Sequence, residues 1–129
     1  MPVPPSPTRS PAANASAPAA IEGAQPFRSA EDAWFWFIEA WTARRDGARI
    51  VAGAGLVPRP CEPIDVLRVL ERLYRQRRLL RDHVAVLGHY GRRLLPPDPR
   101  RPAEHRAHRI WHEALDRLGT ALQAKGIVA

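Results

Sequence analysis

The sequence contains little cysteine and no long apolar run, and each shortage excludes a class of protein. Only one of the 129 residues is a cysteine, Cys61, which excludes an intramolecular disulfide and a multi-cysteine zinc site. The longest apolar run, residues 33–38, is far shorter than the roughly 20 residues of a membrane-spanning helix. The first 30 residues also lack the apolar core of a secretory signal. We therefore expect a soluble, cytoplasmic protein with no membrane partner.

Catalytic motifs are scarce as well. No serine lies in a nucleophile elbow, and no motif surrounds Cys61. The glycines of segment 48–60 are not followed by Gly-Lys-Ser/Thr and have no strand-then-helix frame, which excludes a phosphate-binding loop. We expect a protein that is not an enzyme and that holds no cofactor.

The histidines raise the question of a metal site. Three of them share one face of a predicted helix with an aspartate: His105, His108, His112 and Asp116. Ligands spread along one straight helix span roughly 10 to 16 Å and cannot all reach one ion. A solvated polar face is therefore the simpler interpretation, and we predict no metal site.

Positive charge is abundant but unevenly distributed. Residues 1–63 contain six arginines and six acidic residues, so the whole net charge of +7 belongs to residues 64–129. Such an asymmetry favours a polyanionic partner, nucleic acid first. Nineteen of the 20 basic residues are arginines, with Lys125 the exception, and alanine and proline are also common. A GC-rich coding sequence produces the same bias, so a merely solvated basic face is the alternative.

The first part of the chain divides into a tail and an aromatic helix. Residues 1–28, rich in proline, alanine and serine, are predicted to be a disordered tail, and residues 29–129 a single helical domain. Ser29 is a candidate cap for a helix over 30–45, whose core-facing stripe is Trp34, Phe37, Ile38 and Trp41. Phe35 and Trp36 fall outside this stripe. The helix is therefore either wrapped by others or a partner interface through these two rings, which would indicate an adaptor or homo-oligomer.

Three further apolar patterns follow. Pro63 suits the start of a helix to about residue 76, with a stripe of Ile64, Leu67, Leu70, Leu73 and Tyr74. A second pattern runs from about residue 79 to 90 and stops at Gly91, with Leu80, Val84, Leu87 and Tyr90; the two patterns form either one bent helix or two. Segment 92–102 has four prolines and is predicted to be an extended loop. The last helix covers 103–124 and stops at Lys125-Gly126. We predict an all-α fold: a small bundle of three to four helices after the disordered N-terminal tail.

The basic residues of the second half are the candidate nucleic-acid-binding site. They flank a loop that leads into an amphipathic helix, and arginine suits both phosphates and guanine edges. Arg72 and Arg81 belong to the same basic segments. The candidates are Arg75, Arg77, Arg78, Arg92, Arg93, Arg100, Arg101, His105, Arg106, His108 and Arg109.

The order of two segments carries a family resemblance. LRDHVAVLGHYG, at 80–91, followed by AHRIWHEALDRLGTAL, at 107–122, resembles the C-terminal helix-turn-helix region of sigma-70-type factors (region 4) and of phage-type regulators. The resemblance implies that residues 103–122 form the recognition helix. The family has a scaffold helix and a tight turn between the two parts, where this chain has the four-proline segment. The arginine-rich second half and this resemblance together lead us to expect a DNA-binding or transcription-associated protein.

Overall fold

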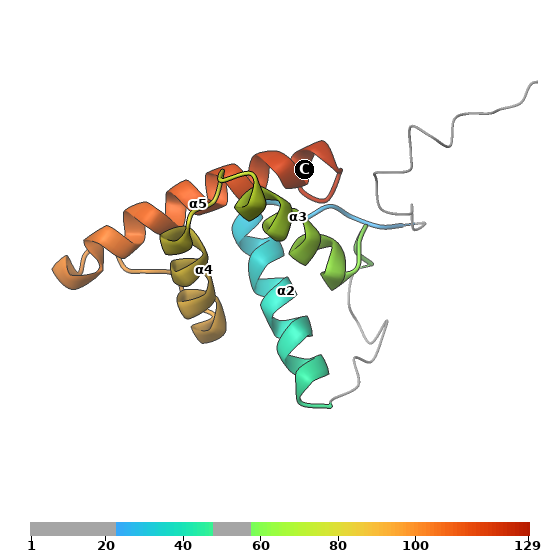
Figure 1. Cartoon of the computed structure of the whole chain (residues 1–129). Helices are drawn as coiled ribbons and strands as arrows, with labels where there is room; N and C mark the ends of the chain where they lie inside the picture. Colours follow the sequence, from blue (N-terminus) through green and yellow to red (C-terminus); the bar gives the residue numbers. More distant parts are fainter. Residues whose placement is uncertain (1–22, 48–57) are drawn as a thin grey trace, which may run out of the picture.

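The computed structural model describes residues 23–47 and 58–129, in which the regular elements are helices joined by turns and loops, with one isolated β-bridge between Phe27 and Val128 (Figure 1). The α-helices are α2 (Ala30–Arg45), α3 (Pro63–Arg75), α4 (Arg81–Arg93) and α5 (His105–Ala124), and a short 3-10 helix, η1 (Pro102–Glu104), precedes α5. The predicted all-α bundle is confirmed, and the patterns between 63 and 90 form two helices. Residues 1–22, which make up most of the predicted tail, lie outside the described residues, as does most of segment 48–60.

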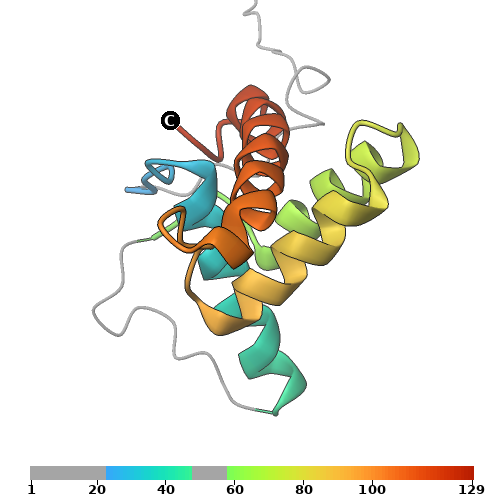
Figure 2. The same cartoon turned by 90° about the vertical axis from the view of Figure 1, so that its left-hand side faces the viewer.

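The longest helix, α5, crosses the ends of the other three (Figure 1). Trp111 on α5 donates its indole N–H to Glu31 at the start of α2, at 3.0 Å. Viewed from the side, α4 crosses α5 at a steep angle (Figure 2). α3 and α4 each pack on α2 and α5 but not extensively against each other. This arrangement leaves the space between α3 and α4 open.

The aromatic helix α2 is central, which confirms its predicted core-facing stripe. Trp34 and Phe37 are buried, whereas Ile38 and Trp41 are half-buried against the same core. The indole N–H of Trp34 donates to the carbonyl of Leu87, 53 residues away, at 2.9 Å. Trp34 therefore ties α2 to α4 by a hydrogen bond as well as by packing.

The ordered region begins earlier than the predicted boundary at residue 29. Phe27 is 2% exposed and lies in the core, and its backbone exchanges hydrogen bonds with Ile127 and Ala129 at 2.9 Å each. The guanidinium group of Arg59 lies over the ring of Phe27, 4.3 Å from the centroid. Phe27 is the one aromatic residue of the sequence 1–28, which is rich in proline, alanine and serine. The composition of the stretch does not identify such a residue, because one aromatic side chain changes the mean hydropathy very little.

Two apolar stripes differ from those predicted. On α3 the buried residues include Val66 and Val69, whereas Tyr74 is 49% exposed. On α4 the buried side chain is His83 rather than Leu80, which is 52% exposed. The physical reason is that α3 and α4 face α2 and α5 rather than each other, which rotates the buried face of both helices.

Gly91 does not end α4, contrary to the prediction, because the helix continues to Arg93. A Cβ atom at Gly91 would lie 2.7 Å from Nε1 of Trp34 and 3.0 Å from Cγ1 of Ile38. The glycine therefore allows α2 and α4 to approach closely. The αL residue that does end the helix is Leu94, at φ 54°.

Candidate functional site

A cluster of arginines surrounds the turn between α3 and α4. In the ranges that the structure describes, none of their guanidinium groups pairs with a carboxylate. Four of them are exposed, and Arg72 is half-buried. We call this set the turn arginines: Arg72, Arg75, Arg77, Arg78 and Arg81.

The backbone of this turn is closed by local hydrogen bonds. Arg77 adopts the left-handed conformation, at φ 62°, and its N–H donates to the carbonyl of Tyr74. The N–H of Arg78 donates to the carbonyl of Leu73 at 2.8 Å, which completes the usual pattern of a helix C-terminus. Leu79 follows and is fully buried. An apolar anchor thus holds a turn whose other side chains project into solvent.

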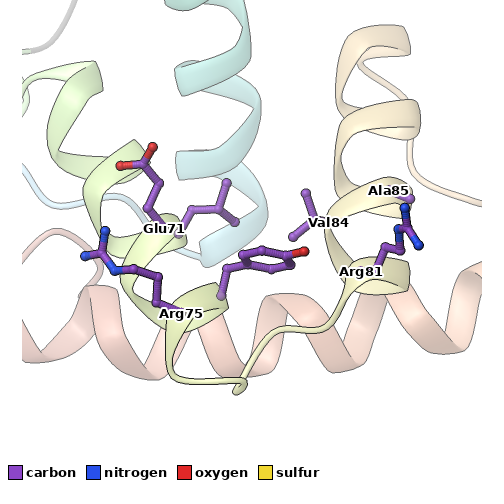
Figure 3. A pocket seen from close by; sticks show the side chains of 7 residues that line it. Glu71, Arg75, Arg81, Val84 and Ala85 are labelled. Atoms are coloured by element: carbon purple, nitrogen blue, oxygen red, sulfur yellow. The ribbon is translucent and has the colours of Figure 1, made fainter.

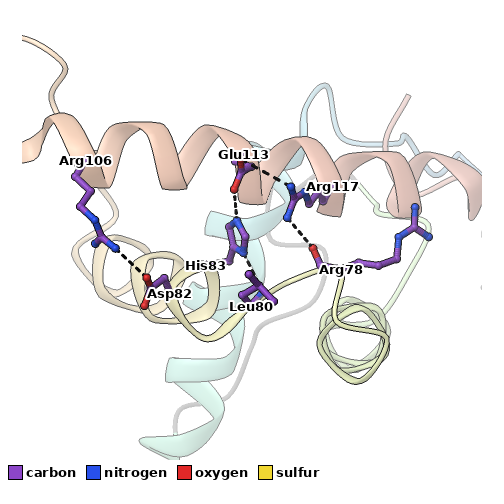
Figure 4. A network of polar contacts seen from close by, with 7 residues as sticks. All are labelled: Arg78, Leu80, Asp82, His83, Arg106, Glu113 and Arg117. Atoms are coloured by element: carbon purple, nitrogen blue, oxygen red, sulfur yellow. Dashed lines mark hydrogen bonds and ion pairs between the residues drawn. The ribbon is translucent and has the colours of Figure 1, made fainter.

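A polar network fixes the same turn to α5 (Figure 4). The backbone N–H of Leu80 donates to Nδ1 of His83 at 2.9 Å, and Nε2 of His83 lies 2.5 Å from a carboxylate oxygen of Glu113. Because Nδ1 accepts a hydrogen bond, the imidazole proton lies on Nε2 and is donated to Glu113. Arg117 bridges Glu113 and the carbonyl of Arg78, at 3.8 and 3.1 Å.

The electrostatics of the network favour an ionised Glu113. The hydrogen bond from His83 and the charge of Arg117 lower the pKa of its carboxyl group from the ordinary value. Glu113 is therefore an anion at neutral pH, and it orients both His83 and Arg117. The turn arginines are thus mounted on a turn that is held from two directions.

Two openings flank the end of α3. An apolar groove of about 490 Å³ lies between α3 and α4, and its lining is Leu70, Glu71, Tyr74, Arg75, Arg81, Val84 and Ala85 (Figure 3). A more polar pocket of about 330 Å³ lies between α3 and α5, and its lining is Arg72, Leu73, Gln76, Arg78, Arg117, Thr120, Ala121 and Ala124. At about 100° per residue, the two sets of α3 residues lie on opposite faces of the helix. The turn arginines therefore border both openings.

The predicted site residues of the proline-rich connection, unlike the turn arginines, pair with carboxylates. Asp98 pairs with Arg100 at 3.3 Å and with Arg101 at 3.9 Å, and Arg101 also lies 3.7 Å from Glu104. Hydrogen bonds from the backbone and side chain of Arg100 lower the pKa of Asp98. Arg106 at the start of α5 pairs with Asp82 of α4 at 2.9 Å. We call Arg100, Arg101 and Arg106 the paired arginines.

The remaining predicted residues are dispersed over α4 and α5. Arg93 lies over the ring of Tyr90, 5.7 Å from its centroid, and Arg92 is exposed beside it. On α5, His105 and Arg109 are exposed, whereas His108 is half-buried. The ring of His108 meets that of His112 edge-on at 4.4 Å. The structure thus places the eleven predicted residues in separate groups, not in one site.

The connection from α4 to α5 spans residues 94–104 and contains η1. A helix-turn-helix joins its two helices by a turn of about three or four residues. The nearer match to that length here is the α3–α4 turn, residues 76–80. The candidate site is therefore the set of turn arginines, not α5 as a recognition helix.

The two rings of the predicted partner interface have partners within the chain. Phe35 packs against Trp111 at 5.6 Å between centroids, and Trp36 against Phe27 at 5.0 Å. Both side chains are half-buried and contact the core. Their position outside the α2 stripe is explained by packing within the chain.

Cys61 is the one cysteine of the chain, and it is buried. Burial raises the pKa of the Cys61 thiol to about 12, assisted by Asp65 and Glu62, so this thiol stays protonated at neutral pH. Over the described ranges, no group of three or more histidine, cysteine or acidic side chains is placed to hold a metal ion. In those ranges, too, no helix has the length and apolar character needed to cross a bilayer.

The sequence analysis does not identify four residues of the site. It assigns Tyr74 to the core stripe and gives no role to His83, Glu113 and Arg117. The i, i+4 spacing of Glu113 and Arg117 indicates an ion pair on α5, but no local signal connects either residue to His83. No family model, curated protein or solved structure matches the chain. The function must therefore be inferred from the site itself.

Proposed function

We propose that the protein binds DNA, without catalysing a reaction, through phosphate contacts of the turn arginines. The observation that supports this best is that five arginines without carboxylate partners surround one fixed turn. Free guanidinium groups offer forked donors that match phosphate oxygens, and they need not break an ion pair first. Transcription-associated binding is the biological role that fits such a module.

The polar pocket between α3 and α5 supplies a phosphate site of suitable chemistry. Arg72, Arg78 and Arg117 line it, together with the hydroxyl-bearing Thr120. The guanidinium groups of Arg72 and Arg78, which have no carboxylate partner in the described residues, attract an anion there, whereas Arg117 is already paired with Glu113. The backbone at Arg78 is held by Arg117, so part of this arrangement exists before a ligand binds.

The alternative is a protein–protein adaptor or homo-oligomer built around α2. This alternative stays a prediction, and it has less support because Phe35 and Trp36 already pack against Trp111 and Phe27. Light scattering that gives a monomer, together with DNA binding, would favour the proposed function over it.

A salt-dependent titration tests the proposal. A labelled oligonucleotide is titrated with protein by fluorescence anisotropy between roughly 50 and 200 mM salt, where phosphate binding weakens steeply. Two triple variants are compared: Arg75→Ala with Arg78→Ala and Arg81→Ala, and Arg100→Ala with Arg101→Ala and Arg106→Ala. Each removes three positive charges, so their net charges match.

We expect the turn variant to bind about 100-fold more weakly, on the order of 1 kcal/mol for each lost phosphate contact. The slope of its log affinity against log salt concentration should decrease by the equivalent of about three phosphate contacts. The paired-arginine variant should lose no more than about fivefold. Equal losses in both variants would indicate unspecific attraction to net charge and contradict the proposed site. Absence of binding at the lowest salt would contradict the function.

A further inference from the structure

The apolar groove between α3 and α4 is open because these helices pack on α2 and α5 and not extensively on each other. Its apolar lining comes from Leu70 and Tyr74 on α3 and from Val84 and Ala85 on α4. Figure 3 shows Arg75 on the α3 side and Arg81 on the α4 side of the opening. The groove is thus an apolar slot between two positive charges.

Tyr74 is the distinctive residue of this groove. Its side chain is 49% exposed, although its neighbour Leu73 is buried in the core. Among the described residues, no other ring lies in stacking contact with it. Its phenol ring is therefore free to stack on a ligand.

Glu71 restricts the chemistry of the occupant. Glu71 lines the same groove, with its carboxylate directed away from α4 (Figure 3), and no arginine is paired with it in the described part of the chain. A carboxylate at the edge of the groove repels an acidic peptide but accepts hydrogen bonds from an amino group such as that of a nucleobase. A flat aromatic ring with phosphates beside it matches the tyrosine and the two arginines.

We infer that the groove holds an unpaired nucleobase stacked on Tyr74, so that the protein prefers single-stranded DNA to duplex DNA. This inference rests on the proposed function and specifies its ligand. In a duplex each base is already stacked between neighbours and cannot enter the groove, whereas a single strand can turn one base outward. The turn arginines hold the backbone, and the groove holds the base.

The test compares three labelled ligands of about 12 nucleotides, a length within the usual range for single-strand sites. They are a single strand, its duplex, and a strand of the same length in which the bases are replaced by abasic sites. The full chain is titrated as wild type, Tyr74→Ala, Tyr74→Phe and Leu80→Ala. Leu80 is the matched control because it is similarly exposed, at 52%, but does not line the groove.

We expect the wild type to bind the single strand at least about tenfold more tightly than the other two ligands. Tyr74→Ala should weaken single-strand binding about tenfold and leave duplex binding unchanged, because it removes the stacking ring and no charge. Tyr74→Phe should retain the preference, and Leu80→Ala should behave as wild type. A 2-aminopurine placed in the strand should lose fluorescence on binding to the wild type but not to Tyr74→Ala.

Two results would overturn the inference, and they differ in their consequence. Equal binding of single strand, duplex and abasic strand, with no effect of Tyr74→Ala, would refute the base pocket and leave the phosphate-binding function intact. Absence of binding to all three ligands at low salt would refute both. Circular dichroism of each variant establishes that the fold is unchanged, as expected for an exposed side chain.

Discussion

The two connections at the ends of α4 are both arginine-rich, but their arginines are in different electrostatic states. The α3–α4 turn, residues 76–80, is bordered by the turn arginines, which have no carboxylate partner in the described part of the chain. The α4–α5 connection, residues 94–104, has Asp98 and Glu104 paired with its arginines. Positive charge is therefore available at the first connection and largely compensated at the second.

The same connections also differ in how they are held. The buried imidazole of His83 fixes the first to Glu113 of α5, whereas contacts between the half-buried Asp98 and exposed arginines organise the second. Exposed ion pairs contribute little to stability, but hydrogen bonds of a buried polar group are costly to remove. The comparison shows that the number of arginines in a segment does not by itself identify a binding site.

The largest effect is expected where the C-terminal end of α4 meets α2. Gly91→Ala places a Cβ 2.7 Å from Trp34 and should lower the free energy of unfolding by up to about 3 kcal/mol. Gly88→Ala, in the same helix, meets only the mobile end of Arg92 at 3.3 Å. It should be neutral or stabilise by up to about 1 kcal/mol, because alanine favours helix. Urea denaturation of both variants measures the difference, and equal stabilities would refute the close approach.

The next effect concerns the anchor of the turn. His83→Ala removes the hydrogen bonds to Leu80 and Glu113 and leaves a small cavity, and we expect a loss of about 2 kcal/mol. Asp98→Ala in the other connection should cost less, because its partners are exposed. Thermal unfolding compares the two. His83→Ala should also weaken DNA binding at temperatures where it is folded, and unchanged affinity would show that the turn needs no anchor.

The stability of the protein at acidic pH should depend on Glu113, which contacts the first connection, and on Asp98 in the second. The folded-state pKa of Glu113 is lowered from its ordinary 4.5, so its contribution is fully present above that value. The contribution is lost as the pH falls through the lowered pKa. The same sign holds for Asp98, from its ordinary 3.8. Melting temperatures below about pH 5 should therefore depend less on pH in Glu113→Gln and in Asp98→Asn. Unchanged pH profiles would contradict the assigned hydrogen bonds.

The smallest effect separates conformation from charge. Arg77 and Leu94 end their helices at φ 62° and 54°, where glycine is less strained. Arg77→Gly and Leu94→Gly should each stabilise by about 0.5 kcal/mol. Only Arg77→Gly should weaken DNA binding, by roughly fivefold, because it alone removes a turn arginine. If both variants lower affinity equally, the loss comes from the backbone and not from the charge.

Helix positions were largely predictable from local signals. The start of α2 follows from Ser29, which accepts a hydrogen bond from Asp32, and the end of α5 follows from Gly126 at φ 76°. The four prolines correctly excluded a regular helix over 92–102, although α4 extends into that segment as far as Arg93. Such signals act within one helical turn, so the sequence carries them without knowledge of the fold.

The candidate site was predictable only in part. Arg75, Arg77 and Arg78 were proposed together from their proximity in the chain. Asp98 and Glu104 lie within three residues of the arginines they pair with, Arg100 and Arg101, and this local signal was not used. The distinguishing fact is the position of carboxylates, and the partner of Arg106 is Asp82, 24 residues away. The exposure of Tyr74 likewise depends on which helices α3 faces.

The sequence by itself therefore determined that this chain is helical and that its net positive charge lies in residues 64–129, because periodicity, capping and composition are local properties. Tertiary structure decided which arginines remain unpaired, why Gly91 is needed inside a helix, and that a groove separates α3 from α4. These features depend on residues that are distant in the sequence and that take up their positions only when α3 and α4 pack on α2 and α5. Both connections of α4 are arginine-rich, but only the first is bordered by arginines without carboxylate partners in the described residues.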